Sequence, residues 1–258
     1  MNTPAQPEKT RAAIMNIRIA FSENTPEHGG NKIEILSQVF NMAAPVVIRN
    51  RGKLTRVAED GIEAVFGNST ERALACALDM FNGIPTAGGS GQQPEISVGI
   101  HTGTVFFSNL SYGEFSVPVA ISDVAYVAHK LSEAASRYNA RILMSQTAVS
   151  RVRSFETRFN SRKLGKIYLQ RSDSEDMIYD VFDSDPTNLK YRKRRSRLVF
   201  ETGVTLFLNG EYHQSRNYFI ELLKYDRNDK TAKDYVLLCD KAISGKPLEK
   251  REKYLEIW

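Results

Sequence analysis

The stretch Arg56-Val-Ala-Glu-Asp-Gly-Ile-Glu-Ala-Val-Phe-Gly67 decides the fold of this 258-residue chain. Apolar residues on both sides of a short polar interruption predict two β-strands, Lys53 to Val57 and Gly61 to Phe66, joined by a tight turn. Two adjacent carboxylates, Glu59 and Asp60, stand at the tip of this hairpin. An Asp in such a turn has a plain structural explanation, because its side chain can hydrogen-bond its own backbone.

The residues around the hairpin predict a sheet with crossing helices. Residues Ala12 to Phe21 alternate with a period of two, which indicates a strand with one apolar face. Two segments have apolar residues at helical spacing, one from Asn31 to Gly52 and one that opens at Asn68. Two further strands are expected on either side of a break at His101-Thr-Gly103, namely Glu95 to Ile100 and Thr104 to Asn109. We therefore predict an α+β fold with a ferredoxin-like βαββαβ order.

The predicted domain boundary falls at a change of composition after residue 185. A helix at Ile121 to Ala135 and strands at Arg141 to Met144, Lys163 to Leu169 and Asp176 to Phe182 complete a first domain of residues 12–185. The basic run Lys190-Tyr-Arg-Lys-Arg-Arg-Ser-Arg197 then predicts a linker over residues 186–197. The run has six cations and one aromatic but no recognition helix or zinc spacing beside it, so nucleic-acid binding is not expected.

Residues 198–258 predict a small all-α region. The positions of Gly203, Gly210 and Ser215 resemble one tetratricopeptide repeat over about residues 196 to 229, a unit with a period of ~34 residues. Asp229 to Ile243 predicts a third amphipathic helix. Because a single repeat cannot bury its own apolar face, this region must dock on the first domain, on the third helix or on a partner protein.

Composition is that of a globular protein, with 41% hydrophobic and 25% charged residues and a net charge of +5. Cys76 and Cys239 each lie in an apolar helical pattern, which favours buried free thiols in a reducing compartment over a disulfide. We therefore expect a cytoplasmic location, either alone or as part of a larger signalling protein. No apolar run reaches the ~18 residues that a membrane helix needs, so no membrane segment is expected in this chain.

The hairpin, together with Ile14-Met-Asn-Ile-Arg18 and Ile121-Ser-Asp-Val-Ala-Tyr-Val-Ala-His-Lys-Leu131, resembles the catalytic domain of the class III nucleotidyl cyclases, the adenylate and guanylate cyclases. The resemblance spans about residues 12 to 182 and implies a site at a dimer interface. Family members hold two metal ions on two aspartates to cyclise a nucleoside triphosphate. The positions that correspond in this chain are Asn16 and Asp60.

Most functional positions implied by the resemblance carry other residues here. Asn16 is a weaker metal ligand than a carboxylate. Arg56 replaces a base-reading lysine, and Val119, which cannot hydrogen-bond, replaces a base-reading aspartate or threonine. Tyr126 replaces the ribose-orienting asparagine, and Lys130 replaces an arginine and loses its bidentate fork. Of these positions only Asp60 matches outright.

The first hypothesis is therefore a catalytically degenerate cyclase-like domain with a regulatory, dimerising or ligand-sensing role in intracellular signalling. It implies a homodimer or heterodimer, no resident cofactor, and nucleotide binding as the less favoured case. A second hypothesis is an active cyclase, dependent on magnesium or manganese, in which Glu59 supplies the missing carboxylate; adjacent strand residues face opposite ways, which argues against it. A third is an interaction scaffold that binds a protein partner through the repeat-like region.

Overall fold

The computed structural model describes residues 8–21, 29–83, 95–112, 115–169 and 173–246, with residues 248, 252 and 254. Its elements in chain order are β1 (Glu8–Ala20), α1 (Gly29–Arg49), β2 (Lys53–Ala58), β3 (Gly61–Val65), α2 (Thr70–Asn82), β4 (Glu95–Tyr112), β5 (Phe115–Ile121), α3 (Asp123–Arg137), β6 (Ile142–Ser145), α4 (Gln146–Val149), α5 (Phe155–Arg158), β7 (Ser161–Leu169), β8 (Ser174–Val181), α6 (Thr187–Leu208), α7 (Tyr212–Tyr225) and α8 (Lys230–Ile243).

One mixed sheet organises the molecule. Its strand order is β2-β3-β1-β4-β6-β8-β7, and β5 pairs with β4 alone. Strands β1 to β4 lie side by side in the order β2-β3-β1-β4, and neighbouring strands within this group are antiparallel. Together with α1 and α2 they form the ferredoxin-like βαββαβ unit that the sequence predicts.

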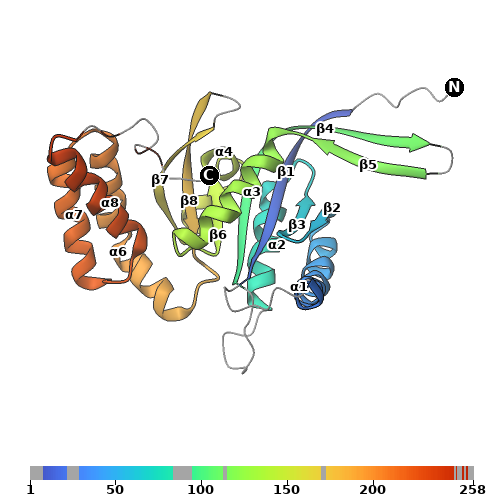
Figure 1. The fold of residues 1–258 in the computed structure, drawn as a ribbon, viewed down its shortest axis with the longest axis horizontal. Coiled ribbons are helices and arrows are strands. Elements are labelled where there is room, and N and C mark those ends of the chain that lie inside the picture. Colours follow the sequence, from blue (N-terminus) through green and yellow to red (C-terminus); the bar gives the residue numbers. More distant parts are fainter. Residues whose placement is uncertain are drawn as a thin grey trace.

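Helices cover both faces of the sheet, as Figure 1 shows. The alternation of β1 explains how, since successive side chains point to opposite faces. Met15, Ile17 and Ile19 belong to a core shared with α1 and α2. Ala12 and Ile14 belong to a separate cluster with Val124 and Ala128 of α3 on the other face. The residues of β1 that share the α3 face, including Asn16, are the ones that concern the candidate site.

The β4 and β5 strands depart from the sequence prediction. The break expected at His101-Thr-Gly103 does not occur, because β4 is one continuous strand that pairs with β1 from Glu95 to Phe107. His101 and Thr102 are buried within it and satisfied by side-chain hydrogen bonds to Ser145 and to the Ala12 carbonyl. Beyond this region β4 forms a hairpin with β5, which the sequence reading missed, and this arm projects from the body of the molecule (Figure 1).

The C-terminal helices share a core with the sheet. Helix α6 starts at Thr187, so the basic run forms helical turns where the sequence reading placed a linker. Its Phe200 lies in one apolar cluster with Phe219 of α7 and Tyr235 of α8, and the cluster continues into Leu164 of β7 and Ile178 of β8. The repeat-like hairpin of α6 and α7 therefore packs both against α8 and against the strands of the sheet, as two of the expected alternatives require.

A buried set of charges, which we call the seam network, joins this helical region to the sheet. Its members are Arg162 on β7, Asp180 on β8, Asp185 in the connection from β8 to α6, Lys193 on α6, and Asp229 at the start of α8. All five side chains are at most 3% exposed. Lys193 contacts Asp180 at 2.8 Å and Asp185 at 2.6 Å, so part of the basic run has a structural role.

Candidate functional site

The hairpin tip is held against β1 by backbone contacts. Ala58 pairs with Gly61, which leaves Glu59 and Asp60 as the turn. Gly61 has a φ of 151°, and a Cβ there would lie 2.1 Å from the Ile17 carbonyl oxygen, so only glycine allows this close approach. The Ile19 amide also donates to the Asp60 carbonyl oxygen at 3.2 Å. Asp60 is thereby positioned beside β1.

The Asp60 carboxylate lies among basic side chains from two directions. Arg56 Nη2 on the same hairpin is 3.6 Å from Asp60 Oδ1, and His129 Nε2 of α3 is 3.9 Å from Oδ2. His129 Nε2 also lies 3.7 Å from Glu133 Oε1. The imidazole therefore stands between two carboxylates, one on the hairpin and one on α3.

Glu133 extends this group across to β1. Its carboxylate forms ion pairs with Arg18, whose Nη1 lies 3.2 Å away, and with Lys130, whose Nζ lies 2.7 Å away. We call these residues the Asp60 cluster: Arg18, Arg56, Asp60, His129, Lys130 and Glu133. Two carboxylates in it face three permanent cations and one histidine, and every side chain in it is partly exposed.

Glu59 does not join the cluster. Its carboxylate oxygen lies 2.5 Å from Lys32 Nζ of α1, whereas Asp60 meets α3. Because α1 and α3 cover opposite faces of the sheet, the side chains of these two adjacent turn residues point to opposite faces. They do not form a pair of carboxylates on one face.

Asn16 lies further from the hairpin tip along β1 than Arg18 does. In the structure Asn16 pairs with Glu63, while Arg18 pairs with Gly61 next to the tip. The Asn16 side chain is buried, and its Oδ1 accepts a hydrogen bond of 2.8 Å from the Ser132 hydroxyl of α3. The β1 residues nearest in register to the hairpin tip are therefore Arg18 and Ile19.

The remaining predicted positions are only partly brought together. Arg56 and Lys130 lie in the Asp60 cluster. Tyr126 lies at its margin, with Lys130 Nζ 6.0 Å from its ring centroid, and packs against the apolar cluster that leads to the C-terminal helices. Val119 lies on the arm, paired with Ser108, outside the cluster.

Sequence reasoning missed Arg18, His129 and Glu133. Signals for them were present: Arg18 is two residues from Asn16 on the same strand face, and His129 and Glu133 have the i,i+4 spacing of one helix face. What the sequence does not contain is the distance between α3 and the hairpin tip. That distance depends on the tertiary packing of the helix.

The donor set of the cluster does not fit a pair of divalent cations. Mg²⁺ is bound through carboxylates and phosphates in near-octahedral oxygen geometry. Here Asp60 lies between Arg56 and His129, and the carbonyl oxygen of Asn16 is occupied by Ser132. Among the residues that the structure describes, no group of three or more His, Cys, Asp or Glu side chains is arranged to hold a metal ion.

Other potentially reactive groups are buried away from this cluster. Both cysteines are free and buried, and burial raises the pKa of the Cys76 thiol to about 12, which keeps it unreactive. Burial also lowers the pKa of the His101 imidazole to about 4, so it is neutral near pH 7. None of the helices in the described ranges is long and apolar enough to cross a membrane.

Comparison in sequence identifies a cyclase relative. No protein-family model matches the chain. An adenylate cyclase of Dictyostelium discoideum, described as terminal-differentiation specific, is 23% identical over 225 residues. The match covers 84% of this chain but 11% of that protein, so the chain corresponds to a small part of its relative.

Comparison in structure identifies the same fold. A bacterial light-regulated adenylyl cyclase superposes with a TM-score of 0.61 at 14% identity, over 74% of this chain and 58% of that one. The adenylyl cyclase CyaB from P. aeruginosa superposes with a TM-score of 0.55 at 18% identity, over 69% of this chain and 96% of that one. A guanylyl cyclase domain from Blastocladiella emersonii, described as a non-canonical dimer, has a TM-score of 0.53 at 13% identity, over 67% and 97%. The chain thus has the fold of adenylyl and guanylyl cyclase domains.

Proposed function

We propose that this chain is a catalytically degenerate cyclase-like domain that works as a dimerising regulatory module in signalling. The observation that carries the proposal is the placement of Asp60, whose carboxylate lies between Arg56 and His129, beside a β1 strand that presents Arg18. The Arg56 guanidinium at this distance competes with a metal ion for the only acid that matches the cyclase pattern. In-line phosphoryl chemistry depends on such ions, so the arrangement does not support it.

The direction of Glu59 weakens the case for an active cyclase with an unusual metal site. That alternative needs Glu59 and Asp60 to act on one phosphorus, yet Glu59 contacts Lys32 on the α1 face of the sheet. A turn residue would have to reverse its orientation to reach Asp60. The other carboxylate nearby, that of Glu133, already forms ion pairs with Arg18 and Lys130.

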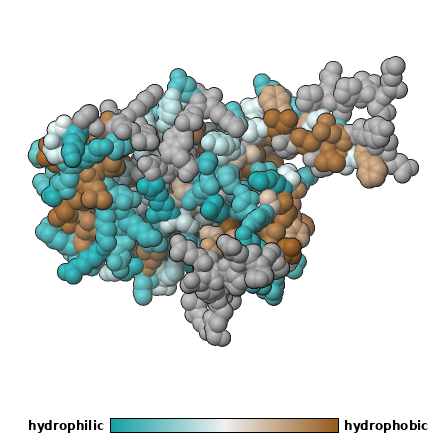
Figure 2. All heavy atoms as spheres, viewed as in Figure 1, coloured by the Kyte–Doolittle hydropathy of each residue, from teal (hydrophilic) through white to brown (hydrophobic). Residues whose placement is uncertain are grey.

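Self-association is proposed through one face of the β4–β5 arm. In the register of this hairpin Phe106 pairs with Ile121 and Leu110 pairs with Val117, which puts these four side chains on one face. All four are exposed, and Phe115 near the tip is 79% exposed. Figure 2 shows brown apolar surface along the arm. Apolar patches of this kind mark protein contacts, and a relative of the same fold is described as dimeric.

The C-terminal helices are proposed to be a rigid extension of the domain, with a tetratricopeptide-like hairpin in α6 and α7. Gly203 allows the two helices to approach, since a Cβ there would lie 2.9 Å from the Phe219 ring. The Ser215 hydroxyl donates to the Gly203 carbonyl oxygen at 2.8 Å. Because these helices share a core with the sheet, deleting them would expose that core and would not test a separate scaffold function.

The activity test uses the purified full chain with ATP or GTP and Mn²⁺, and measures cyclic nucleotide by mass spectrometry. We expect no product above that of a matched Asp60→Asn variant. Product that disappears in Asp60→Asn would contradict the proposal. Product that is equal in both proteins would come from a contaminating cyclase and leave the expected result in place.

The association test uses sedimentation velocity on the full chain and on a Leu110→Ser/Val117→Ser double variant. We expect the chain to form a dimer and the variant to be monomeric, with unchanged far-UV circular dichroism. Leu198→Ser, on an exposed side chain of α6, is the matched control and should remain a dimer. A monomeric wild type, or a double variant that still dimerises, would rule out the arm as the interface.

A further inference from the structure

A second polar site lies at the opposite end of the β2–β3 hairpin from Asp60. A pocket of about 880 Å³ opens between the start of β2, the loop from β3 to α2, and the first part of the arm. Asp60 is at the closed tip of the hairpin, whereas Lys53 and Val65 pair at its open end. About six residues of strand, or roughly 20 Å, separate the two ends. The pocket and the Asp60 cluster are thus separate sites.

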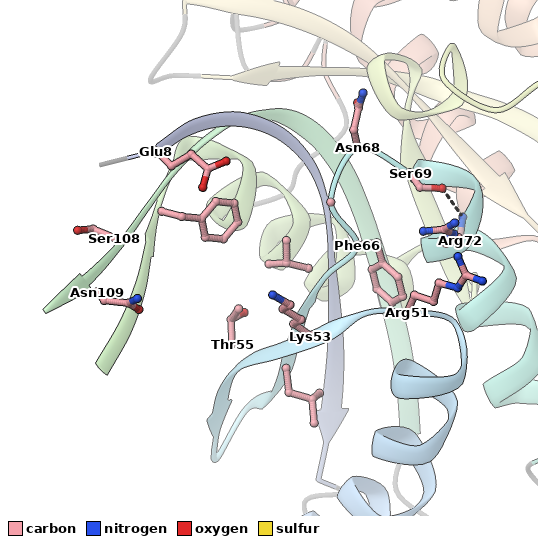
Figure 3. Close-up of a pocket in the computed structure, with 14 residues that line it drawn as sticks. Glu8, Arg51, Lys53, Thr55, Phe66, Asn68, Ser69, Arg72, Ser108 and Asn109 are labelled. Atoms are coloured by element: carbon pink, nitrogen blue, oxygen red, sulfur yellow. Dashed lines mark hydrogen bonds between the residues drawn. The ribbon is translucent and has the colours of Figure 1, made fainter. Parts of the chain in front are cut away.

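Three cations line this pocket, and they come from two parts of the chain. Arg51 follows α1, Lys53 begins β2, and Arg72 lies in the first turn of α2. Figure 3 shows Arg51 and Arg72 at one end of the pocket near Ser69, with Lys53 between them and Asn109 of the arm. None of the three forms an ion pair with any residue in the described ranges, although most basic residues of the Asp60 cluster and the seam network do.

The electrostatics of the pocket favour an anion. Against the three cations stands one acid, Glu8, at the rim. Ser69 is the N-cap of α2 and accepts from the Arg72 amide, so the positive end of the helix dipole also faces this region. Cations that remain unpaired around one concave surface raise its affinity for phosphate or carboxylate groups.

The rest of the lining combines uncharged polar side chains with an apolar wall. Leu54 and Val65 of the hairpin, Phe66 before the loop, and Phe107 of the arm contribute to the pocket wall. The volume lies in the range of ~300 to 1,000 Å³ that is typical of sites for small organic molecules. A ligand that fits both parts has an anionic group and an apolar or aromatic body.

We propose that this pocket binds a small organic phosphate, with its phosphate held by Arg51, Lys53 and Arg72 and its apolar body against Phe107 and Leu54. Arginine suits this role because its planar fork matches phosphate oxygens. Phe107 and Asn109 belong to the arm, so an occupied pocket joins the arm to the hairpin. The inference does not depend on the activity proposed for the Asp60 cluster.

The test is isothermal titration calorimetry on the full chain with three probes: 1-naphthyl phosphate, inorganic phosphate and 1-naphthol. We expect naphthyl phosphate to bind at least tenfold more tightly than either of the others, and its affinity to fall as salt rises. Naphthol that binds as well as naphthyl phosphate would overturn the anionic part of the proposal. Inorganic phosphate that binds as well would overturn the apolar part.

Charge variants locate the site. Arg72→Gln and Arg51→Asn should each weaken naphthyl phosphate about tenfold. Asn is chosen at position 51 because Arg51 has a φ of 59°, a conformation that asparagine tolerates. Glu8→Gln removes the opposing charge and should tighten binding about twofold to threefold.

Two control variants complete the experiment. Arg153→Gln removes an exposed cation elsewhere and should leave the affinity unchanged, and so should Arg56→Gln in the Asp60 cluster. Melting temperatures confirm that each variant is folded. Affinity that is insensitive to Arg51 and Arg72, or that depends on Arg56, would overturn the assignment.

Discussion

The Asp60 cluster and the seam network both bring carboxylates and cations together, but they differ in burial and spacing. In the seam network the side chains are at most 3% exposed, and Lys193 and Arg162 each contact two carboxylates within 3.1 Å. In the Asp60 cluster the side chain of Asp60 is 44% exposed, and its contacts are 3.6 and 3.9 Å long. Solvent screens the second group far more than the first.

This difference indicates what each group of charges does. The seam network fixes the C-terminal helices on the sheet, because an uncompensated charge in that environment is costly. The charges of the Asp60 cluster neutralise one another at the surface and contribute little to folding. Asp60 is the acid that the sequence resemblance matches to a metal ligand of the cyclases. The molecule therefore has the fold of cyclase domains, with opposed charges around Asp60 and a buried charge network between the sheet and the C-terminal helices.

The largest expected effect is the loss of a buried cation from the seam network. Lys193→Met leaves Asp180 and Asp185 without their shared partner and should lower the free energy of unfolding by about 3 to 5 kcal/mol. Urea denaturation measures this change. Arg56→Met is the matched change in the Asp60 cluster and should cost less than about 1 kcal/mol. Equal losses in the two variants would remove the distinction between the two regions.

The pH dependence of stability provides a second test of the seam network. Burial raises the pKa of the Asp185 carboxyl to about 6, above its ordinary value of 3.8. A raised pKa means that its contribution to stability is present below about pH 4 and is lost as the pH rises through 6. Relative to Asp185→Asn, the wild type should lose about 2 to 3 kcal/mol between pH 4 and pH 7. A constant difference over that range would show that burial does not control this carboxyl.

His101 should act in the opposite direction over the same range. Its pKa is lowered by burial to about 4, so its contribution is present above pH 6.5 and is lost as the pH falls through 4. Relative to His101→Gln, the wild type should gain about 3 kcal/mol between pH 4 and pH 7. Urea denaturation at several pH values separates the two contributions. A difference of the same sign for both variants would contradict the assigned causes.

A smaller effect is expected when the missing carboxylate is restored. Asn16→Asp places an acid in a buried position beside Ser132 and should lower the free energy of unfolding by about 1 to 3 kcal/mol. It should not create a metal site, because position 16 pairs with Glu63 and the residue in register with Gly61 is Arg18. Thermal melting with and without Mn²⁺ measures both effects. A Mn²⁺-dependent rise in melting temperature would show that Asn16 reaches Asp60.

Much of the fold follows from local sequence patterns. The alternation of residues 12 to 21 and the hairpin around Asp60 predict the strands β1, β2 and β3, and helical spacing predicts α1, α2 and α3. The arm was missed because strand β5 carries Pro118 and follows directly on β4, so its pattern does not stand apart. The linker expected at 186–197 is instead part of α6, and its Lys193 forms a buried ion pair with Asp185 that the sequence pattern does not reveal.

The candidate site was less predictable for a physical reason. Register between strands and the packing of α3 decide which residues meet Asp60, and neither is encoded in a short motif. In the observed register Arg18 pairs with Gly61 and Asn16 pairs with Glu63, so Arg18 lies nearer the hairpin tip than Asn16 does. Likewise the pocket brings Arg51 and Lys53, at the start of β2, together with Arg72 of α2, which lies about twenty residues further along the chain. These features depend on tertiary packing.

The most direct test of the account measures metal binding at Asp60. The EPR signal of free Mn²⁺ is titrated with the full chain in the presence of a non-hydrolysable ATP analogue, with Asp60→Asn as the reference. The account predicts that wild type and variant remove the same amount of Mn²⁺ from solution, namely the amount that the nucleotide alone binds. Two additional ions bound per wild-type chain, and lost in Asp60→Asn, would contradict it.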